Sequence, residues 1–377
     1  MKSDSSTKPK TDEIGGRTTS RPSGLLGHAW RPRVWLAAFV VMAGMAVVLS
    51  LSVGAVHLPF GRVIATLWER TTGLGGPSVL TGTDAAVLFE IRLPRVVLGL
   101  VVGSALSLAG ASYQGVFRNP LADPYLLGAA AGAGLGATLI LSNAVNITGW
   151  QVNALPLAAF AGAIVAVLLS VAMASVVGFG SGDGSVASSA AVLLLAGVAV
   201  ASFLTAIQTF VQQQRADSLR VVYAWILGGL TTSGWSEVRL VTPYLCVAVV
   251  VLLSLARRLD VMAVGDDEAR SLGVSPTKVR VLVVIAASLA TAAAVSVSGL
   301  IGFVGLVVPH AVRSLVGHGH RFVLLGSILL GGAFVVLADS VARTVVAPAE
   351  LPLGVLTAFI GAPAFALLLV RQHRSRS

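Results

Sequence analysis

Charged side chains are scarce in this sequence. They make up 11% of its 377 residues, whereas a soluble domain carries roughly 25%. Hydrophobic residues make up 55%, and the mean hydropathy is +0.88. Because so few charges cannot keep so many apolar side chains in water, most of these side chains must face something else. The composition therefore excludes an ordinary soluble fold and predicts a membrane protein.

Cysteine is nearly absent as well. The single cysteine, Cys246, lies in an apolar run, so no disulfide can form within the chain and no metal cluster can be built from cysteine. His310, His318 and His320 lie near the end of another apolar run, but no carboxylate or thiol stands beside them. We therefore expect no metal site.

The motifs of common enzyme classes are also missing. No glycine is followed by lysine, so the chain lacks the phosphate-binding loop with its lysine. Neither His-Glu-x-x-His nor Gly-x-Ser-x-Gly occurs. We expect no catalytic residues and no cofactor bound by this chain, and a membrane-embedded enzyme is disfavoured. The net charge of +10 does not indicate a nucleic-acid partner, because the basic residues lie between apolar runs.

What the sequence does contain is a series of long apolar runs. A helix needs about 20 mostly apolar residues to cross roughly 30 Å of hydrocarbon, and backbone groups in lipid must bond to one another. The runs are too uniformly apolar for barrel strands, which alternate. The sequence predicts an all-α, polytopic membrane protein with about ten transmembrane helices, at roughly 34–56, 94–114, 124–142, 155–178, 189–212, 239–256, 279–298, 300–316, 322–345 and 354–370.

The ends of the chain differ from these runs. Residues 1–33 hold seven Lys or Arg and no apolar core, which is not the pattern of a cleaved secretory signal. We interpret them as a polar cytoplasmic tail, followed by a transmembrane domain at 34–371 and a cytoplasmic tail at 372–377. With the N-terminus inside, inner segments hold 18 basic residues and outer segments eight, as the positive-inside rule requires. We therefore expect a multi-pass protein of the cell membrane with both termini in the cytoplasm.

Two charged patterns lie at the expected outer ends of spans. In Arg92-Leu93-Pro94-Arg95 the arginines are three apart and share one helical face. They form either a fixed positive site for an acidic partner or an interfacial anchor. Asp339 and Arg343 are four apart in the ninth span, and we expect them to pair, because charges in a span are usually paired or functional.

Two connections on the inner side are also distinctive. In the segment from Arg118 to Pro124, two prolines force a rigid turn, so a structured hairpin is expected rather than a catalytic role. The longer connection holds Asp266–Gly273, a short helix by pattern, with acids first, an arginine later and a glycine to end it. Ser275 should then cap the next helix, which begins at Pro276. The short helix either docks a partner or is a surface helix that touches nothing.

These motifs occur in the order and at the spacing of a known family. Over roughly residues 34–371, the sequence resembles the permeases of iron-siderophore, haem and vitamin B12 ABC importers. Further segments that carry the resemblance are Leu127-Gly128, Trp225 with Gly228, Gly302 to His310 with Arg313, Ala338-Asp339 with Ala342-Arg343, and Glu350-Leu351-Pro352 with Gly354.

The resemblance implies a type II ABC importer permease with ten helices per subunit, embedded in membrane lipid. It also implies a second permease subunit, two cytoplasmic ATPase subunits that use ATP and Mg, and an extracytoplasmic substrate-binding protein. A homodimer is the default for the permease pair.

The resemblance also implies roles for particular residues. The coupling helix that sits in a groove of the ATPase would comprise Asp266, Asp267, Glu268, Ala269, Arg270, Ser271, Leu272 and Gly273. Arg92, Arg95 and Arg343 would meet acidic residues of the binding protein. The fifth span would line the pathway, with Ser202, Thr205 and Gln208 at three-residue spacings. Motif residues expected to have structural roles are Arg118, Asn119, Pro120, Asp123, Pro309, His310, Arg313 and Asp339.

The breadth of that family favours an iron chelate as the substrate, with haem or cobalamin as alternatives. An ion-coupled secondary transporter is a more remote alternative. Asp339 is the only carboxylate within an expected span, and a proton-coupled carrier usually displays more.

Overall fold

The computed structural model describes residues 25–54, 58–73, 80–143, 151–180, 190–231 and 234–374. These residues form helices joined by turns, with no strand among them, which confirms the predicted all-α class. Of the predicted tails, residues 1–24 and 375–377 lie outside the described residues. The first helix begins at Leu25 instead of residue 34.

Each of the ten predicted apolar runs overlaps one long helix. These helices are α1 (Leu25–Ser52), α4 (Leu93–Val116), α5 (Ala129–Asn143), α6 (Gln151–Gly180), α7 (Ala190–Gln214), α9 (Trp235–Met262), α11 (Pro276–Ser298), α12 (Val304–Val316), α13 (His320–Thr344) and α14 (Leu353–Arg374). By length and composition, six of the described helices could cross a membrane, and three shorter ones are also apolar.

The helix count of the described chain exceeds ten because short helices occupy the connections. They are α2 (Phe60–Thr72), α3 (Gly82–Ala86), the π-helical turn η1 (Val87–Arg92), the 3-10 turn η4 (Ala216–Ser218), α8 (Leu219–Ile226) and α10 (Asp266–Ser271). Only α10 was expected from the sequence, because the others lie in the connections between the apolar runs.

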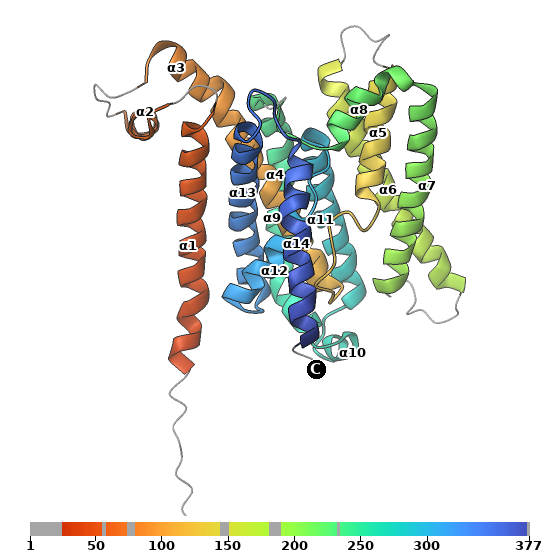
Figure 1. Ribbon diagram of the computed structural model, residues 1–377. Coiled ribbons are helices and arrows are strands. Elements are labelled where there is room, and N and C mark those ends of the chain that lie inside the picture. The colour runs from red at the N-terminus through yellow and green to blue at the C-terminus, as the bar shows by residue number, and fades with distance from the viewer. Residues whose placement is uncertain are drawn as a thin grey trace, which may run out of the picture.

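Figure 1 shows the long helices running side by side, with α1 at one edge and α7 at the opposite edge. At one end of the bundle lie α2, α3 and α8, and we name this the α8 end. At the other end, the α10 end, lie α10, the first turn of α1 and the last turn of α14. The described chain therefore begins and ends on the same side of the bundle.

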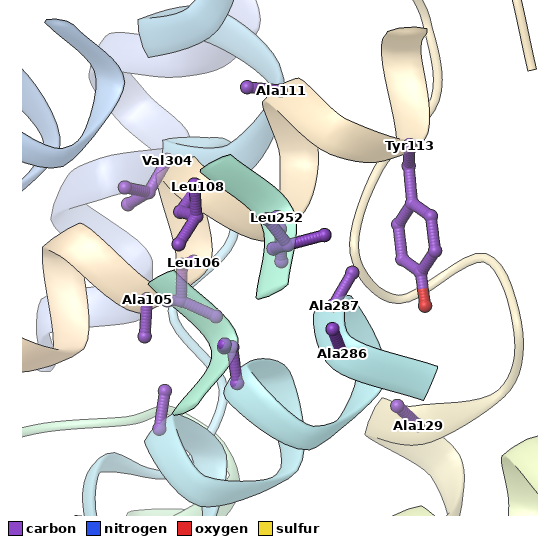
Figure 2. Close-up of a cluster of buried hydrophobic side chains, with 14 of the residues drawn as sticks. Ala105, Leu106, Leu108, Ala111, Tyr113, Ala129, Leu252, Ala286, Ala287 and Val304 are labelled. Carbon is purple, nitrogen blue, oxygen red and sulfur yellow. The ribbon is translucent and has the colours of Figure 1, made fainter. Parts of the chain in front are cut away.

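The centre of the bundle is built around α4 and α11. α4 packs against α9, α11, α12 and α13, and it is buried along nearly its whole length. Figure 2 shows Leu106 and Leu108 of α4 in one cluster with Leu252 of α9, Ala287 of α11 and Val304 of α12. In the most apolar 18-residue stretch of α11, 78% is buried inside the bundle. The corresponding share is 22% in α1 and in α7. α11 is thus an inner helix, whereas α1 and α7 turn much of their surface outward.

Glycines allow these helices to approach closely. A Cβ atom on Gly110 of α4 would overlap the backbone of Gly305 in α12, and one on Gly132 of α5 would overlap that of Gly162 in α6. Between helices in lipid, such close backbone packing replaces the hydrophobic drive that water would supply. The bundle is therefore intolerant of larger side chains at these crossings.

Candidate functional site

A cluster of four charged side chains lies at the α8 end. Asp339 of α13 is its centre: Arg95 of α4 donates to it from Nε at 3.0 Å and from Nη2 at 2.8 Å. Arg343 lies one turn further along α13, with its Nε 3.0 Å from Asp339 Oδ2, so the predicted pair forms. Arg95 Nη2 also donates to Glu350 at 2.8 Å. Two acids and two arginines thus join α4, α13 and the connection to α14.

Burial differs within this cluster. The Asp339 side chain is 4% exposed and that of Glu350 is 35% exposed. Hydrogen bonds from Arg95 hold the pKa of the Glu350 carboxyl below its ordinary value. Although Glu350 was part of a recognised motif, nothing in the sequence placed it beside Arg95, which is 255 positions away.

The three arginines predicted to dock a binding protein have partners within the chain. Arg92 is buried at the end of η1 and donates from Nη1 to the carbonyl of Leu51 in α1, at 2.6 Å. Arg92 and Arg95 therefore have different neighbours, despite their three-residue spacing. Arg343 Nη2 donates to Ser50 Oγ at 3.0 Å. Arg92 and Arg343 thus bond to the end of α1, whereas Arg95 joins α4 to α13. The docking role of all three stays a prediction.

A cavity of about 560 Å³ opens beside the charge cluster. Its lining includes Arg95, Asp339 and Glu350, and also Trp225 of α8 and Leu155 of α6. The cluster therefore faces a space between the α4 and α13 pair and the group formed by α5 to α8.

At the α10 end, Asp266 fixes the short helix α10 to the bundle. Its carboxylate accepts from Arg118 Nη2 at 3.1 Å and from Arg280 Nη2 of α11 at 3.1 Å. Gly273 follows α10 with φ +77°, and Pro276 is the first residue of α11, as predicted. The expected cap is wrong in one respect: Ser275 occupies the capping position, but its hydroxyl makes no capping hydrogen bond.

The opposite face of α10 is turned outward. Val264, Asp267 and Leu272 are exposed, and Arg270 pairs with Asp267 on the same helix. A short helix attached to the bundle through Asp266 thus presents mixed apolar and charged groups at the surface.

The connection from α4 to α5 has the rigid turn expected there. Asn119 Oδ1 accepts from the backbone N–H of Leu121 at 2.9 Å, and Asp123 Oδ1 accepts from that of Tyr125 at 2.8 Å. Tyr125 donates its hydroxyl proton to the carbonyl of Ile301, at 3.1 Å. Pro120 needs no such partner, because it lacks an N–H. The turn is thus held by its own side chains and by the segment that precedes α12.

Other polar residues at this end join α4 to α12 and α9 to α13. Arg313 of α12 donates to Gln114 Oε1 at 3.0 Å, and Gln114 Nε2 donates to Leu306 at 3.1 Å. Pro309 and His310 lie within the same helix, α12. His320 Nδ1 lies 2.7 Å from Asp260 Oδ1 of α9. Within the described ranges, no group of three or more His, Cys, Asp or Glu is arranged to hold a metal ion.

Two of the three predicted pathway residues share a hollow. Ser202 and Thr205 of α7 line a space of about 450 Å³ together with Asp123 and Tyr125. Gln208 is turned elsewhere, because its Oε1 lies over Gly134 of α5.

Two further polar residues of α7 were not predicted. Thr209 and Gln213 are exposed, as Ser202 and Thr205 are. Spacings of three, four and four residues put all four on one face of the helix. This face is named the α7 polar stripe. The prediction used three-residue spacings, which lead from Thr205 to Gln208; a spacing of four residues after Thr205 would have found both residues.

The profile of the FecCD transport family matches residues 41–371, which is nearly the whole described bundle. The chain belongs to this family. It is 42% identical to the cobalamin import system permease protein of Halobacterium salinarum, over 78% of this chain and 76% of that one. It is 36% identical to the hemin transport system permease protein of Yersinia pestis, over 92% and 98% of the two chains. A solved inward-facing structure of a metal-chelate type ABC transporter superposes with a TM-score of 0.74 at 29% identity, covering 90% of this chain and 99% of the other.

Proposed function

We propose that this chain is the membrane permease of an ATP-driven importer, and that its substrate is an iron chelate such as a ferric siderophore. The observation that carries the proposal is the family match along residues 41–371. The relatives named above import haem and cobalamin, which are large organic chelates of a metal. Haem and cobalamin are therefore the alternative substrates.

ATP hydrolysis is assigned to separate subunits. The chain has no glycine followed by lysine, so it lacks the phosphate-binding loop. In the proposed assembly, two ATPase subunits bind ATP and Mg in the cytoplasm, and this chain converts their motion into transport.

The proposed contact with the ATPase is α10. Asp266 ties this helix to Arg118 and to Arg280, so a push on α10 would move α11 and the turn after α4 together. Rigid elements that move as units are the usual carriers of such transitions. This assignment puts the α10 end in the cytoplasm, with both ends of the described chain.

The proposed pathway runs along the α7 polar stripe. Polar groups facing lipid are costly, and in membrane helices they usually face a cavity or another helix. Because α7 lies at an edge of the molecule, a second copy is the natural partner for this stripe. Substrate would pass between the two copies, beside Ser202 and Thr205.

The α8 end would then receive the substrate-binding protein. An acidic residue of that protein could reach Arg95 by replacing Glu350, which is the more exposed of its two acids. Complementary charge of this kind mainly sets encounter rate and register.

The decisive experiment is uptake by proteoliposomes that hold this chain with its ATPase and binding protein. Ferric siderophores, haem and cobalamin are offered in turn, with and without ATP. We expect ATP-dependent uptake of a ferric siderophore, and uptake of haem or cobalamin alone would replace the substrate assignment. Transport by the chain alone under an ion gradient would overturn the importer proposal in favour of a secondary carrier.

A matched variant tests the role of α10. Replacing Asp266–Gly273 by a Gly-Ser segment of equal length should leave the chain inserted and abolish ATP-driven uptake. Normal uptake by this variant with normal ATPase association would show that coupling does not run through α10.

A further inference from the structure

The amphipathic helix α2 carries an apolar face that no described part of the chain covers. Phe60, Ile64 and Trp68 follow one another at four-residue spacing, so they lie on one side of the helix. Their side chains are 50%, 44% and 60% exposed. Three large apolar side chains in a row at the surface mark an interaction site.

Contacts on its other faces fix the rotation of α2 about its own axis. Val63 is fully buried in a cluster with Leu51 of α1 and Leu88 of η1. Thr66 Oγ1 accepts from the backbone N–H of Leu80 at 2.9 Å, which ties the helix to the segment that follows it. The exposed apolar face is therefore held outward by the fold and is not the result of a loose helix.

The position of α2 shows what surrounds this face. In Figure 1, α2 is seen end-on beside the last turn of α1, which is seen from the side, so α2 runs across the direction of the long helices. The neighbouring surface of the bundle is the lipid-facing side of α1, where Val41, Met45 and Leu49 are exposed. α7, with its polar stripe, lies at the opposite edge. The apolar face of α2 thus continues a lipid-facing surface and lies far from the proposed second copy.

We propose that α2 is an interfacial helix, which lies in the headgroup region of the leaflet at the α8 end and inserts Phe60, Ile64 and Trp68 among the upper acyl chains. Its partner is phospholipid. Helices of this kind have an apolar face that enters the acyl boundary and a polar face that stays in water, and here Arg62 is exposed on the side opposite Ile64. Trp is also enriched at the membrane–water interface. The assignment rests on the membrane location of the bundle and does not depend on the substrate.

The test measures tryptophan quenching by phospholipids brominated at defined acyl positions, with the full chain in liposomes. The signal of Trp68 is the difference between the unaltered chain and Trp68→Phe. We expect this signal to be quenched more by bromine near the headgroup than by bromine near the bilayer centre, and to be shielded from aqueous iodide. Trp225→Phe is the matched control, because Trp225 lines an internal cavity, and its signal should respond weakly to both bromine positions.

A second variant distinguishes loss of lipid contact from loss of folding. The double variant Phe60→Ser with Ile64→Ser keeps Trp68, and we expect the brominated lipid to lose its effect on Trp68 while ATP-driven uptake persists. Quenching of Trp68 by iodide but not by brominated lipid would overturn the proposal and leave α2 in water. The proposal would also be overturned if Trp68 became shielded from both iodide and brominated lipid only when the binding protein is added. The apolar face of α2 would then be a contact site for that protein.

Discussion

At the α8 end Asp339 is 4% exposed and lies between Arg95 and Arg343, whereas at the α10 end Asp267 is 91% exposed and pairs with Arg270 of its own helix. The first arrangement joins α4 to α13 through charges that water barely reaches. The second leaves the charges on a surface and uses one acid, Asp266, for attachment. Acids and arginines thus form buried ion pairs between helices at the α8 end. At the α10 end, the same residue types form an exposed charged surface.

The largest expected effect is at the buried ion pairs of the α8 end. Asp339→Asn keeps the side-chain shape but leaves Arg95 and Arg343 without their shared acid, so we expect a loss of about 3–5 kcal/mol of stability, as for other broken buried pairs. Unfolding of the purified chain in detergent, followed by near-UV circular dichroism, measures this. Asp217→Asn, an exposed acid at the same end, is the control and should change little. Equal stability of both variants would mean that the cluster does not tie the helices.

An intermediate effect is expected where α10 joins α11. The side chain of Arg280 is 7% exposed and reaches Asp266, which also has Arg118 as a partner. Arg280→Gln should therefore cost about 1–3 kcal/mol, the range for removing one partner of a buried polar pair. The same unfolding measurement applies, and a loss as large as that of Asp339→Asn would remove the contrast between the two ends.

Arg118→Gln should lower the coupling of ATP hydrolysis to transport while leaving the stability of the chain nearly unchanged. Arg118 is 44% exposed, so the stability change should stay below about 1 kcal/mol. If α10 moves the turn after α4 through this pair, transport per ATP hydrolysed should fall severalfold at the same time. The measurement is uptake and phosphate release in the same proteoliposomes, with Arg321→Gln, exposed at the same end, as the control. A proportional fall in both quantities would contradict coupling through Arg118.

Much of this fold could be predicted from the sequence, because long apolar runs are a local signal. Each predicted run overlaps a helix, and the short helix from Asp266 was predicted from its acids and its closing glycine. α2 was missed because three apolar residues four apart do not make a run. The pair of Asp339 and Arg343 was predicted because both lie on one helix.

The rest of the candidate site depends on contacts between distant segments. Arg95 meets Asp339 and Glu350 only because α4 and α13 pack together. Likewise Arg118 meets Asp266 across 148 positions. Spacing along one helix carries no information about such partners, so the residues were selected correctly as motifs while their neighbours could not be predicted.

The smallest expected effect concerns Glu350 and pH. Hydrogen bonds from Arg95 lower the pKa of this carboxyl in the folded chain from its ordinary value of 4.5. The stability that the pair contributes is therefore fully present above the ordinary value and is lost as the pH falls through the lower, folded-state value. Glu350→Gln should reduce this acid-dependent loss while changing stability little at pH 7, because the side chain is partly exposed. The measurement is the unfolding midpoint of the unaltered chain and of Glu350→Gln, from neutral pH down to the lowest pH at which the detergent remains soluble. We expect the two midpoints to converge as the pH falls. If the two midpoints instead changed in parallel with pH, Glu350 would contribute nothing to the stability. The ion pairs that stabilise the α8 end would then be only those between α4 and α13.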